Sequence, residues 1–349
     1  MAISINSAIG KFRNSKVVAA PEFGVLVALV VVSAVFQSFN QVFLTQPVLV
    51  SIVKAMTFVG IIAVGQAILL IVGQLDLSVG AVAGLTAVVA GKMMTSMGLN
   101  VPLAIVLALV FSSFLGFING YMVTKIGVPA FIQTLGMLFI AQGLTQVVGK
   151  GFPIYPLPDV ITKIGETNLF IGLGWSAAVL VFVAIIGDVV TKRMVIGRNL
   201  YVIGGNSEVA RIVGINFKKY QMSAFILTGF LSGAAGILLM SVLTAATPTL
   251  GAGWELLVIA GTVVGGVSLF GGVGTVFGAV LGVLLIQVVQ IGLITSGLNM
   301  NFQNVAVGSI LVAAVTFDVA RRKIKFSGSS ATGKTKEEEV PLSASTSEK

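Results

Sequence analysis

The sequence predicts an all-α membrane protein, a polytopic bundle of about ten transmembrane helices. The 349-residue chain is 56% hydrophobic and only 9% charged, whereas a soluble domain carries about 25% charged residues. Its apolar runs are about 20 residues long, as membrane-spanning helices require, and lack the two-residue period of a barrel strand. Its basic residues are concentrated between and beyond the apolar blocks, as expected for loops that flank membrane spans.

Composition also excludes several classes of function. The chain has no cysteine and no histidine, which removes disulfides, thiolate metal sites and the commonest general base. No nucleophile–base pair or metal-ligand set is apparent, so we expect no enzyme, no catalytic residue and no metal site. The net charge of +9 is attributed to loops beside the membrane rather than to nucleic-acid binding. Residues 328–335 match a phosphate-loop pattern, but no core strand precedes them, so we expect no ATP site.

The predicted elements follow the apolar runs in chain order. Residues 1–23 are a basic cytoplasmic segment before a retained first helix, and the Ser/Lys/Glu-rich residues 321–349 are a disordered cytoplasmic tail. Residues 24–320 form the transmembrane domain, interrupted by a polar excursion at 149–170 and a cytoplasmic loop at 191–220. The ten predicted spans are approximately 24–39, 50–72, 78–97, 102–124, 130–148, 171–190, 221–243, 253–270, 274–295 and 302–320.

Charge distribution predicts the orientation. With both termini cytoplasmic, most lysines and arginines fall on the inner side, as the positive-inside rule requires. Five predicted spans precede residue 170 and five follow it, which predicts a duplication, and the odd number of spans in each half makes the two repeats inverted. Asp76 and Glu255 support the repeat, because each begins a span and the two beginnings lie on opposite faces. At the inner ends of other spans, Asp188 and Asp318 are expected to pair with the nearby basic residues.

Polar side chains within the spans allow two interpretations. Asp76 and Glu255 could cap helix beginnings, and the amides could form bonds between helices. Alternatively, these groups line a path for a polar solute. The candidate pathway residues are Gln66, Asp76, Ser78, Asn119, Gln133 and Glu255. Separately, Gly274, Gly278 and Gly282 recur at the four-residue spacing that favours close helix packing.

The basic loop between the two apolar blocks is predicted to carry a short helix beneath the membrane. Residues 200–203 are apolar, and 204–206 (Gly-Gly-Asn) are expected to form a turn. Asn206 and Ser207 can cap a helix over 208–213. Gly214 is expected to end this helix, because glycine readily adopts the left-handed conformation.

This loop resembles the coupling loop of bacterial ATP-binding-cassette (ABC) importer permeases. Residues 208–214 (EVARIVG) are similar to that group's E-A-A-x-x-x-G pattern, with Val209 in place of alanine. Residues 197–215 (GRNLYVIGGNSEVARIVGI), 73–80 (GQLDLSVG) and 253–282 resemble permeases of the ribose, galactose and xylose import group. The resemblance covers about residues 50–320.

The resemblance implies a multi-pass permease in the bacterial inner membrane that translocates a monosaccharide. Its implied partners are a second permease subunit, a sugar-binding protein at the outer face and an ABC ATPase that uses ATP and Mg²⁺, while this chain itself binds no cofactor. The residues implied to couple the permease to the ATPase are Arg198, Gly204, Gly205, Asn206, Glu208, Ala210, Arg211 and Gly214.

Two other functions remain open at this point. An ion-gradient-driven secondary transporter with inverted repeats would accumulate solute without an ATPase and would depend on Asp76 or Glu255. A purely structural membrane subunit would be insensitive to substitution of any of these residues.

Overall fold

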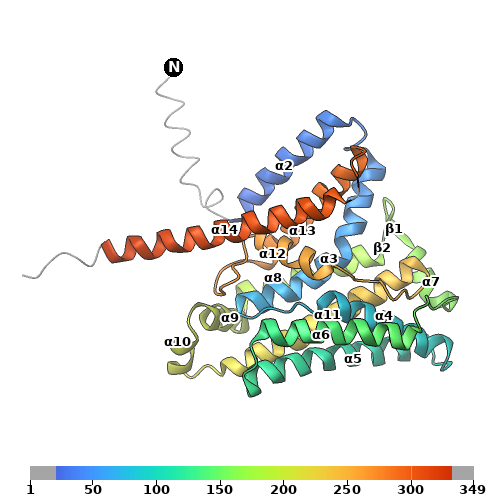
Figure 1. Ribbon diagram of the computed structural model, residues 1–349, viewed down its shortest axis with the longest axis horizontal. Helices are drawn as coiled ribbons and strands as arrows, with labels where there is room; N and C mark the ends of the chain where they lie inside the picture. Colours follow the sequence, from blue (N-terminus) through green and yellow to red (C-terminus); the bar gives the residue numbers. More distant parts are fainter. Residues whose placement is uncertain (1–20, 300, 332–349) are drawn as a thin grey trace, which may run out of the picture.

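The protein is a bundle of α-helices with one small two-stranded hairpin (Figure 1). A computed structural model describes residues 21–299 and 301–331. The first half contains α2 (Pro21–Phe39), α3 (Gln46–Ile71), α4 (Val79–Thr95), α5 (Val101–Tyr121), the π-helix η1 (Met122–Ile126), α6 (Ala130–Gly149) and α7 (Asp159–Glu166). The second half contains β1 (Asn168–Phe170), β2 (Leu173–Gly174), α8 (Trp175–Arg193), α9 (Val195–Gly205), α10 (Ser207–Ile212), α11 (Phe217–Leu243), α12 (Trp254–Val264), α13 (Val276–Thr295) and α14 (Phe302–Ala331).

The membrane-spanning helices match the predicted all-α polytopic fold. Within the described ranges, eight helices are long and apolar enough to cross a membrane. The other two predicted spans correspond to shorter apolar helices, α4 with 17 residues and α12 with 11. The prediction of a continuous span over 253–270 was wrong, because α12 ends at Val264 and a glycine-rich loop follows. Glycine is a poor helix former, which explains the break.

The core is centred on α3, which packs against α8, α11, α12 and α13. Its second half is buried almost without interruption from Met56 to Ile71. Helices α2 and α14 lie along one side of the bundle, opposite α5 and α6 (Figure 1). Only 6% of the apolar window in α2 and in α14 is buried, so these two helices offer most of their surface to the bilayer.

The glycine spacing in α13 packs this helix closely on α12. A side chain at Gly282 would collide with the carbonyl of Gly261, and one at Gly278 would collide with that of Gly265. The backbones of the two helices therefore touch, as the spacing predicted.

The polar excursion contains structure that the sequence analysis did not predict. Helix α7 packs against α11, and β1 pairs with β2 in an antiparallel hairpin. Ile154 forms a β-bridge with Ala246, which fastens the excursion to the segment that follows α11. The excursion is therefore anchored to the second half of the chain.

Helices α9 and α10 lie at one end of the bundle, which we call the loop end. The helices α3, α8 and α12 end there, and α11 and α13 begin there. Helix α14 continues to Ala331, beyond the predicted span boundary at 320, since lysine and arginine are good helix formers. The predicted terminal segments 1–20 and 332–349 lie outside the described residues, and their state stays a prediction.

Two acids at the inner ends of spans were predicted to pair with nearby basic residues. Asp188 pairs with Lys192 at 2.9 Å, as predicted. The pairing of Asp318 with Arg321 and Arg322 stays a prediction, because the side chains of these two arginines lie outside the described residues. Asp318 accepts hydrogen bonds from the Ser268 hydroxyl at 2.9 Å and the Leu269 N–H at 3.3 Å. It thus ties α14 to the loop after α12.

Candidate functional site

The loop helices α9 and α10 meet at a sharp corner. Helix α9 runs through Gly204 and Gly205, so the predicted turn at 204–206 was wrong at its first two positions. The chain leaves the helical conformation at Asn206 (φ −161°, ψ 107°), whose side-chain oxygen accepts from the N–H groups of Glu208 and Val209. The predicted cap of the short helix is therefore confirmed, and it begins at Ser207.

Gly214 ends α10 as predicted. Its φ is +79°, a conformation that costs glycine little and other residues more. The N–H of the next residue, Ile215, donates to the carbonyl of Ala210 at 2.9 Å. This reversal directs the chain back into the membrane at the start of α11.

Helix α10 presents an apolar face to solvent, which the sequence analysis did not identify. Ala210 is fully buried and holds the helix against the bundle, whereas Ile212 is 80% exposed. Val209 and Val213 are exposed as well. Exposed apolar groups clustered on a short helix between two spans are typical of a surface that another protein or the membrane covers.

The charged residues of the loop surround this face. Glu208 and Arg211 approach each other at 3.6 Å, with both side chains largely exposed, so their attraction contributes little to stability. Arg198 is exposed, and within the described part of the chain it has no ion pair with Glu208. These groups are therefore free to interact with a partner.

Gly204 lies in backbone contact with two distant segments. A side chain at this position would collide with the Ile71 carbonyl at the end of α3 and with the Gly272 N–H in the loop after α12. Gly271 packs against Gly204 in turn, and the Gly272 N–H donates to the Ile71 carbonyl at 2.9 Å. We call Ile71, Gly204, Gly271 and Gly272 the glycine junction. It joins helix α9 to the break between α3 and α4 and to the break between α12 and α13.

Tyr201 adds a side-chain bond beside the glycine junction, between α9 and the segment before α13. Its hydroxyl donates to the Gly274 carbonyl at 2.7 Å. Burial raises the pKa of the Tyr201 hydroxyl above its ordinary value of 10.0, so the group keeps its proton at neutral pH and remains a donor. Two residues earlier in α9, the Asn199 amide donates to the Tyr220 hydroxyl at 2.6 Å, which connects α9 to α11.

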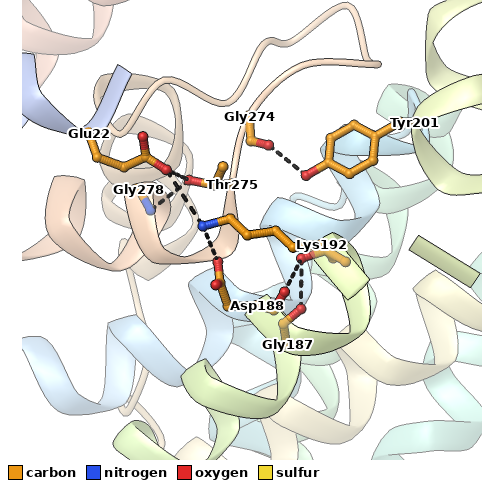
Figure 2. Close-up of polar contacts among 9 residues, drawn as sticks. Glu22, Gly187, Asp188, Lys192, Tyr201, Gly274, Thr275 and Gly278 are labelled. Carbon is orange, nitrogen blue, oxygen red and sulfur yellow. Dashed lines mark hydrogen bonds and ion pairs between the residues drawn. The ribbon is translucent and has the colours of Figure 1, made fainter. Parts of the chain in front are cut away.

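A polar cluster holds the neighbouring helix ends together (Figure 2). Lys192 at the end of α8 lies 2.9 Å from Asp188 and 3.8 Å from Glu22 of α2. Glu22 accepts a 2.7 Å hydrogen bond from the Thr275 hydroxyl, which itself accepts from the Gly278 N–H at the start of α13. The sequence analysis missed Glu22 and Thr275, although an acid before the first apolar run was a usable signal.

Four of the candidate pathway residues form one buried hydrogen-bonded network at the break between α3 and α4. Asp76 is 2% exposed, and its Oδ1 accepts from the Ser78 N–H at 2.7 Å and the Ser78 hydroxyl at 2.6 Å. The Asn119 amide near the end of α5 donates to Asp76 at 3.3 Å and to the Ser78 hydroxyl at 3.0 Å. Gln133 in the first turn of α6 donates to Asn119 at 3.2 Å. The inter-helix interpretation is therefore confirmed in this network. The capping interpretation is wrong for Asp76, because the N-cap of α4 is Ser78, no side chain caps this helix, and Asp76 binds only the N–H of Ser78.

Glu255 lies close to the same region, contrary to the prediction that it opens its span from the opposite face. A β-carbon on Gly80, in the first turn of α4, would lie 2.8 Å from Glu255 Oε2. The reason is that residues 244–253 fold back into the bundle, so that α12 begins beside α4. Oε2 is buried and has no hydrogen-bond partner among the described residues.

Gln66 is not part of the network. It is fully buried within α3, and neither its amide oxygen nor its nitrogen has a hydrogen-bond partner in the described part of the chain. An unpartnered amide of this kind is costly in an apolar interior. Gln66 and Glu255 are therefore the two candidate pathway residues with hydrogen-bonding capacity to spare.

The side chains of the site can bind and position polar groups by hydrogen bonding. Among residues 21–299 and 301–331, no three acidic side chains lie close enough to hold a metal ion. The network contains one carboxylate, one hydroxyl and two amides at the start of a short helix, and the glycine junction connects its backbone to an exposed loop.

Comparisons with known proteins agree with this arrangement. The family model of the permease component of the branched-chain amino acid transport system matches residues 48–316. The chain is 33% identical to the ribose import permease protein of Haemophilus influenzae over 296 residues, which cover 84% of this chain and 91% of the relative. It is 32% identical to the D-allose transport system permease protein of Escherichia coli over 299 residues, with coverage of 85% and 91%.

A third relative is the autoinducer 2 import system permease protein of Photorhabdus luminescens. It is 33% identical over 261 residues, which cover 74% of this chain and 77% of the relative. No solved structure matches the chain significantly. These relatives favour an importer permease over an ion-gradient-driven transporter. The chain therefore belongs to this permease family and is a multi-pass inner-membrane permease subunit of an ABC importer.

Proposed function

We propose that this permease carries a monosaccharide or a similarly small polyhydroxylated solute, and that a separate ATPase drives it through α10. One observation carries the coupling mechanism. Gly204 lies three residues before the exposed helix α10 begins, and it touches the backbone at the end of α3 and in the loop after α12. A displacement of α10 therefore has a direct mechanical route to the start of α4 and the end of α12.

The coupling follows from how tightly these backbones pack. The exposed apolar face of Val209, Ile212 and Val213 provides a seat for the ATPase. Interiors are close-packed and transmit strain, so a shift of α9 would move Ile71 and Gly272 together. The Asp76 network begins five residues beyond Ile71 in sequence. ATP and Mg²⁺ would be bound by the partner, and this chain would bind no cofactor.

The proposed solute class rests on the relatives and on the polar groups. The named relatives transport ribose, D-allose and autoinducer 2, and the matching family model is named for amino acid transport. Neutral amides and hydroxyls suit a solute with many hydroxyl groups, since each can donate and accept. Gln66 and Glu255, which lack partners in the described chain, are the groups we assign to solute contact.

The remaining partners follow from this function. We propose that both termini are cytoplasmic, that the loop end faces the ATPase and that a sugar-binding protein docks at the opposite end. A second permease subunit would complete the pore. Helix α6 suits that contact, because Gly136 and Gly143 face open space and Gln142 is exposed within the span. Small residues and exposed amides favour helix association in membranes.

A pair of adjacent glycines tests the coupling. Gly204→Val places a side chain against the Ile71 carbonyl, and such overpacking costs about 1–3 kcal/mol. We expect ATP-driven uptake of ribose or allose in proteoliposomes to fall roughly tenfold or more. Gly205→Ala is the matched control, because nothing lies near the added β-carbon, and its uptake should equal that of the wild type.

The same assay separates the proposed function from its alternative. Wild-type vesicles should accumulate sugar only with the ATPase, the binding protein and ATP. Accumulation by the permease alone under an ion gradient would contradict the proposal. Equal uptake by Gly204→Val and Gly205→Ala would contradict the coupling route through the glycine junction.

Single cysteines test the second subunit, since the native chain has none. Gly136→Cys and Gly143→Cys should form disulfide-linked dimers in oxidised membranes. Ile185→Cys, exposed on α8, is the control and should stay monomeric. A dimer with Ile185→Cys but with neither α6 variant would refute this face as the contact.

A further inference from the structure

A cavity of about 750 Å³ lies at the loop end, between α2, α14 and the loop that follows α12. Its walls are mainly apolar and include Val25, Val264, Ile310, Ala314 and Phe317. Helices α2 and α14, which flank it, are the two spans whose surfaces are least buried among the described residues. In a membrane this cavity is therefore bordered by helices that acyl chains surround.

The size and chemistry of the cavity favour an acyl chain as its occupant. Its volume corresponds to about 25 groups the size of a water molecule, at about 30 Å³ each. Water enters such a space only where several polar partners await it, and most of this lining cannot form hydrogen bonds. A hydrocarbon chain fills it at no such cost.

One end of the cavity is polar. Asp318 lies in the lining, and its Oδ2 accepts from Ser268 and from the Leu269 N–H. Its Oδ1 accepts no hydrogen bond from the described residues. A carboxylate at the end of an apolar cavity matches a headgroup that carries a primary ammonium, because the N–H groups of the ammonium donate to carboxylate oxygens.

We propose that the cavity binds an aminophospholipid of the phosphatidylethanolamine type, with one acyl chain inside and the ammonium at Asp318. Gly205, Gly271 and Gly272 also line the cavity, and the last two belong to the glycine junction. The bound lipid therefore packs against Gly271 and Gly272, the residues through which a displacement of α9 would reach the loop after α12. This second effect, on transport, rests on the proposed coupling function, whereas lipid binding itself does not.

Lipid binding is tested on the full chain without its partners. The protein is reconstituted in nanodiscs of phosphatidylethanolamine, phosphatidylglycerol and phosphatidylcholine, released into detergent, and its retained lipid counted by native mass spectrometry. We expect retention of phosphatidylethanolamine by the wild type, and its loss in Ala314→Trp, which fills the cavity. Val312→Trp is the matched control, because Val312 is 67% exposed on the same helix and outside this cavity; it should retain the lipid.

A second variant tests the headgroup. Asp318→Asn keeps the apolar walls but removes the charge, and should reduce the preference for phosphatidylethanolamine over phosphatidylcholine by roughly fivefold. Equal retention by Ala314→Trp and Val312→Trp would overturn the site. Equal retention of phosphatidylcholine by the wild type, or a preference for phosphatidylglycerol, would overturn the headgroup assignment.

Uptake measurements then test the consequence for transport. With the ATPase and binding protein present, ATP-driven uptake by the wild type should be lower in phosphatidylcholine vesicles than in those containing phosphatidylethanolamine, and Ala314→Trp should lose this difference. If the protein retains phosphatidylethanolamine selectively but uptake does not depend on the lipid, the effect of the lipid on the glycine junction is refuted, whereas the lipid site is not. Absence of uptake in every lipid would count against the proposed function and leave the lipid site standing.

Discussion

The beginnings of α4 and α12 differ in how they treat an acidic side chain. Both helices are short, both follow an irregular segment, and an acid stands at each beginning. Asp76 is held by Ser78 and Asn119, whereas Glu255 has a buried oxygen without a partner in the described chain. Similar sequence positions thus give a fixed carboxylate at α4 and an available one at α12. We interpret the first as structural and the second as functional.

The largest effect is expected from Asp76→Ala. The substitution leaves the Ser78 N–H and the Ser78 hydroxyl without their acceptor and removes one of the two acceptors of the Asn119 amide. Each unsatisfied buried group costs about 1–3 kcal/mol. We expect a clear drop in the thermal unfolding temperature in detergent, followed by fluorescence. The exposed acid Asp159 at the start of α7 gives the control Asp159→Ala, which should change stability little. Equal stability of both variants would remove the structural role of Asp76.

Glu255→Gln should give the opposite pattern to Asp76→Ala. It keeps the shape of the side chain but removes a charge that has an unpartnered buried oxygen, so the unfolding temperature should stay the same or rise. Sugar uptake should nevertheless fall, by roughly tenfold, if Glu255 contacts the solute. Asp76→Asn provides the comparison, since its main defect should be in stability. A Glu255→Gln protein that unfolds earlier yet transports normally would reverse the assignment of the two acids.

The smallest change is expected from Gln66→Leu. Replacing a buried amide that has no partner by an apolar group of similar size should stabilise the protein by about 1 kcal/mol. Asn119→Leu removes an amide that does have partners and should destabilise it. Chemical denaturation of both variants in the same detergent measures the difference. Destabilisation by Gln66→Leu would show that its amide has a role in folding.

Sequence reasoning found the polar residues but not their grouping. Asp76, Ser78, Asn119 and Gln133 were each recognisable as polar groups in apolar spans, and helix-cap chemistry correctly predicted Asn206. That the first four meet depends on how α4, α5 and α6 pack, which no local pattern encodes. Glu255 was predicted to lie on the face opposite to Asp76. It lies near the start of α4 instead, because residues 244–253 fold back into the bundle before α12.

The glycines show the same limit in another form. Gly204 and Gly205 were predicted to form a turn, because glycine commonly interrupts helices. In the structure both glycines lie inside α9. Gly204 allows the backbone of α9 to pack directly against the carbonyl of Ile71. A sequence cannot distinguish these uses of glycine, because the difference lies in a distant segment. The left-handed Gly214 was predictable because its cause is local.

The hydrogen bond from Gly272 to Ile71 has a further consequence. It ties a segment from the first half of the chain to one from the second, at the point where α9 touches both. A displacement of α9 then acts on both halves of the chain at once, so that neither half moves before the other. If the ATPase displaces α10 as we propose, the two halves of the permease would therefore move together, and little of the displacement would be lost before it reaches the helix breaks.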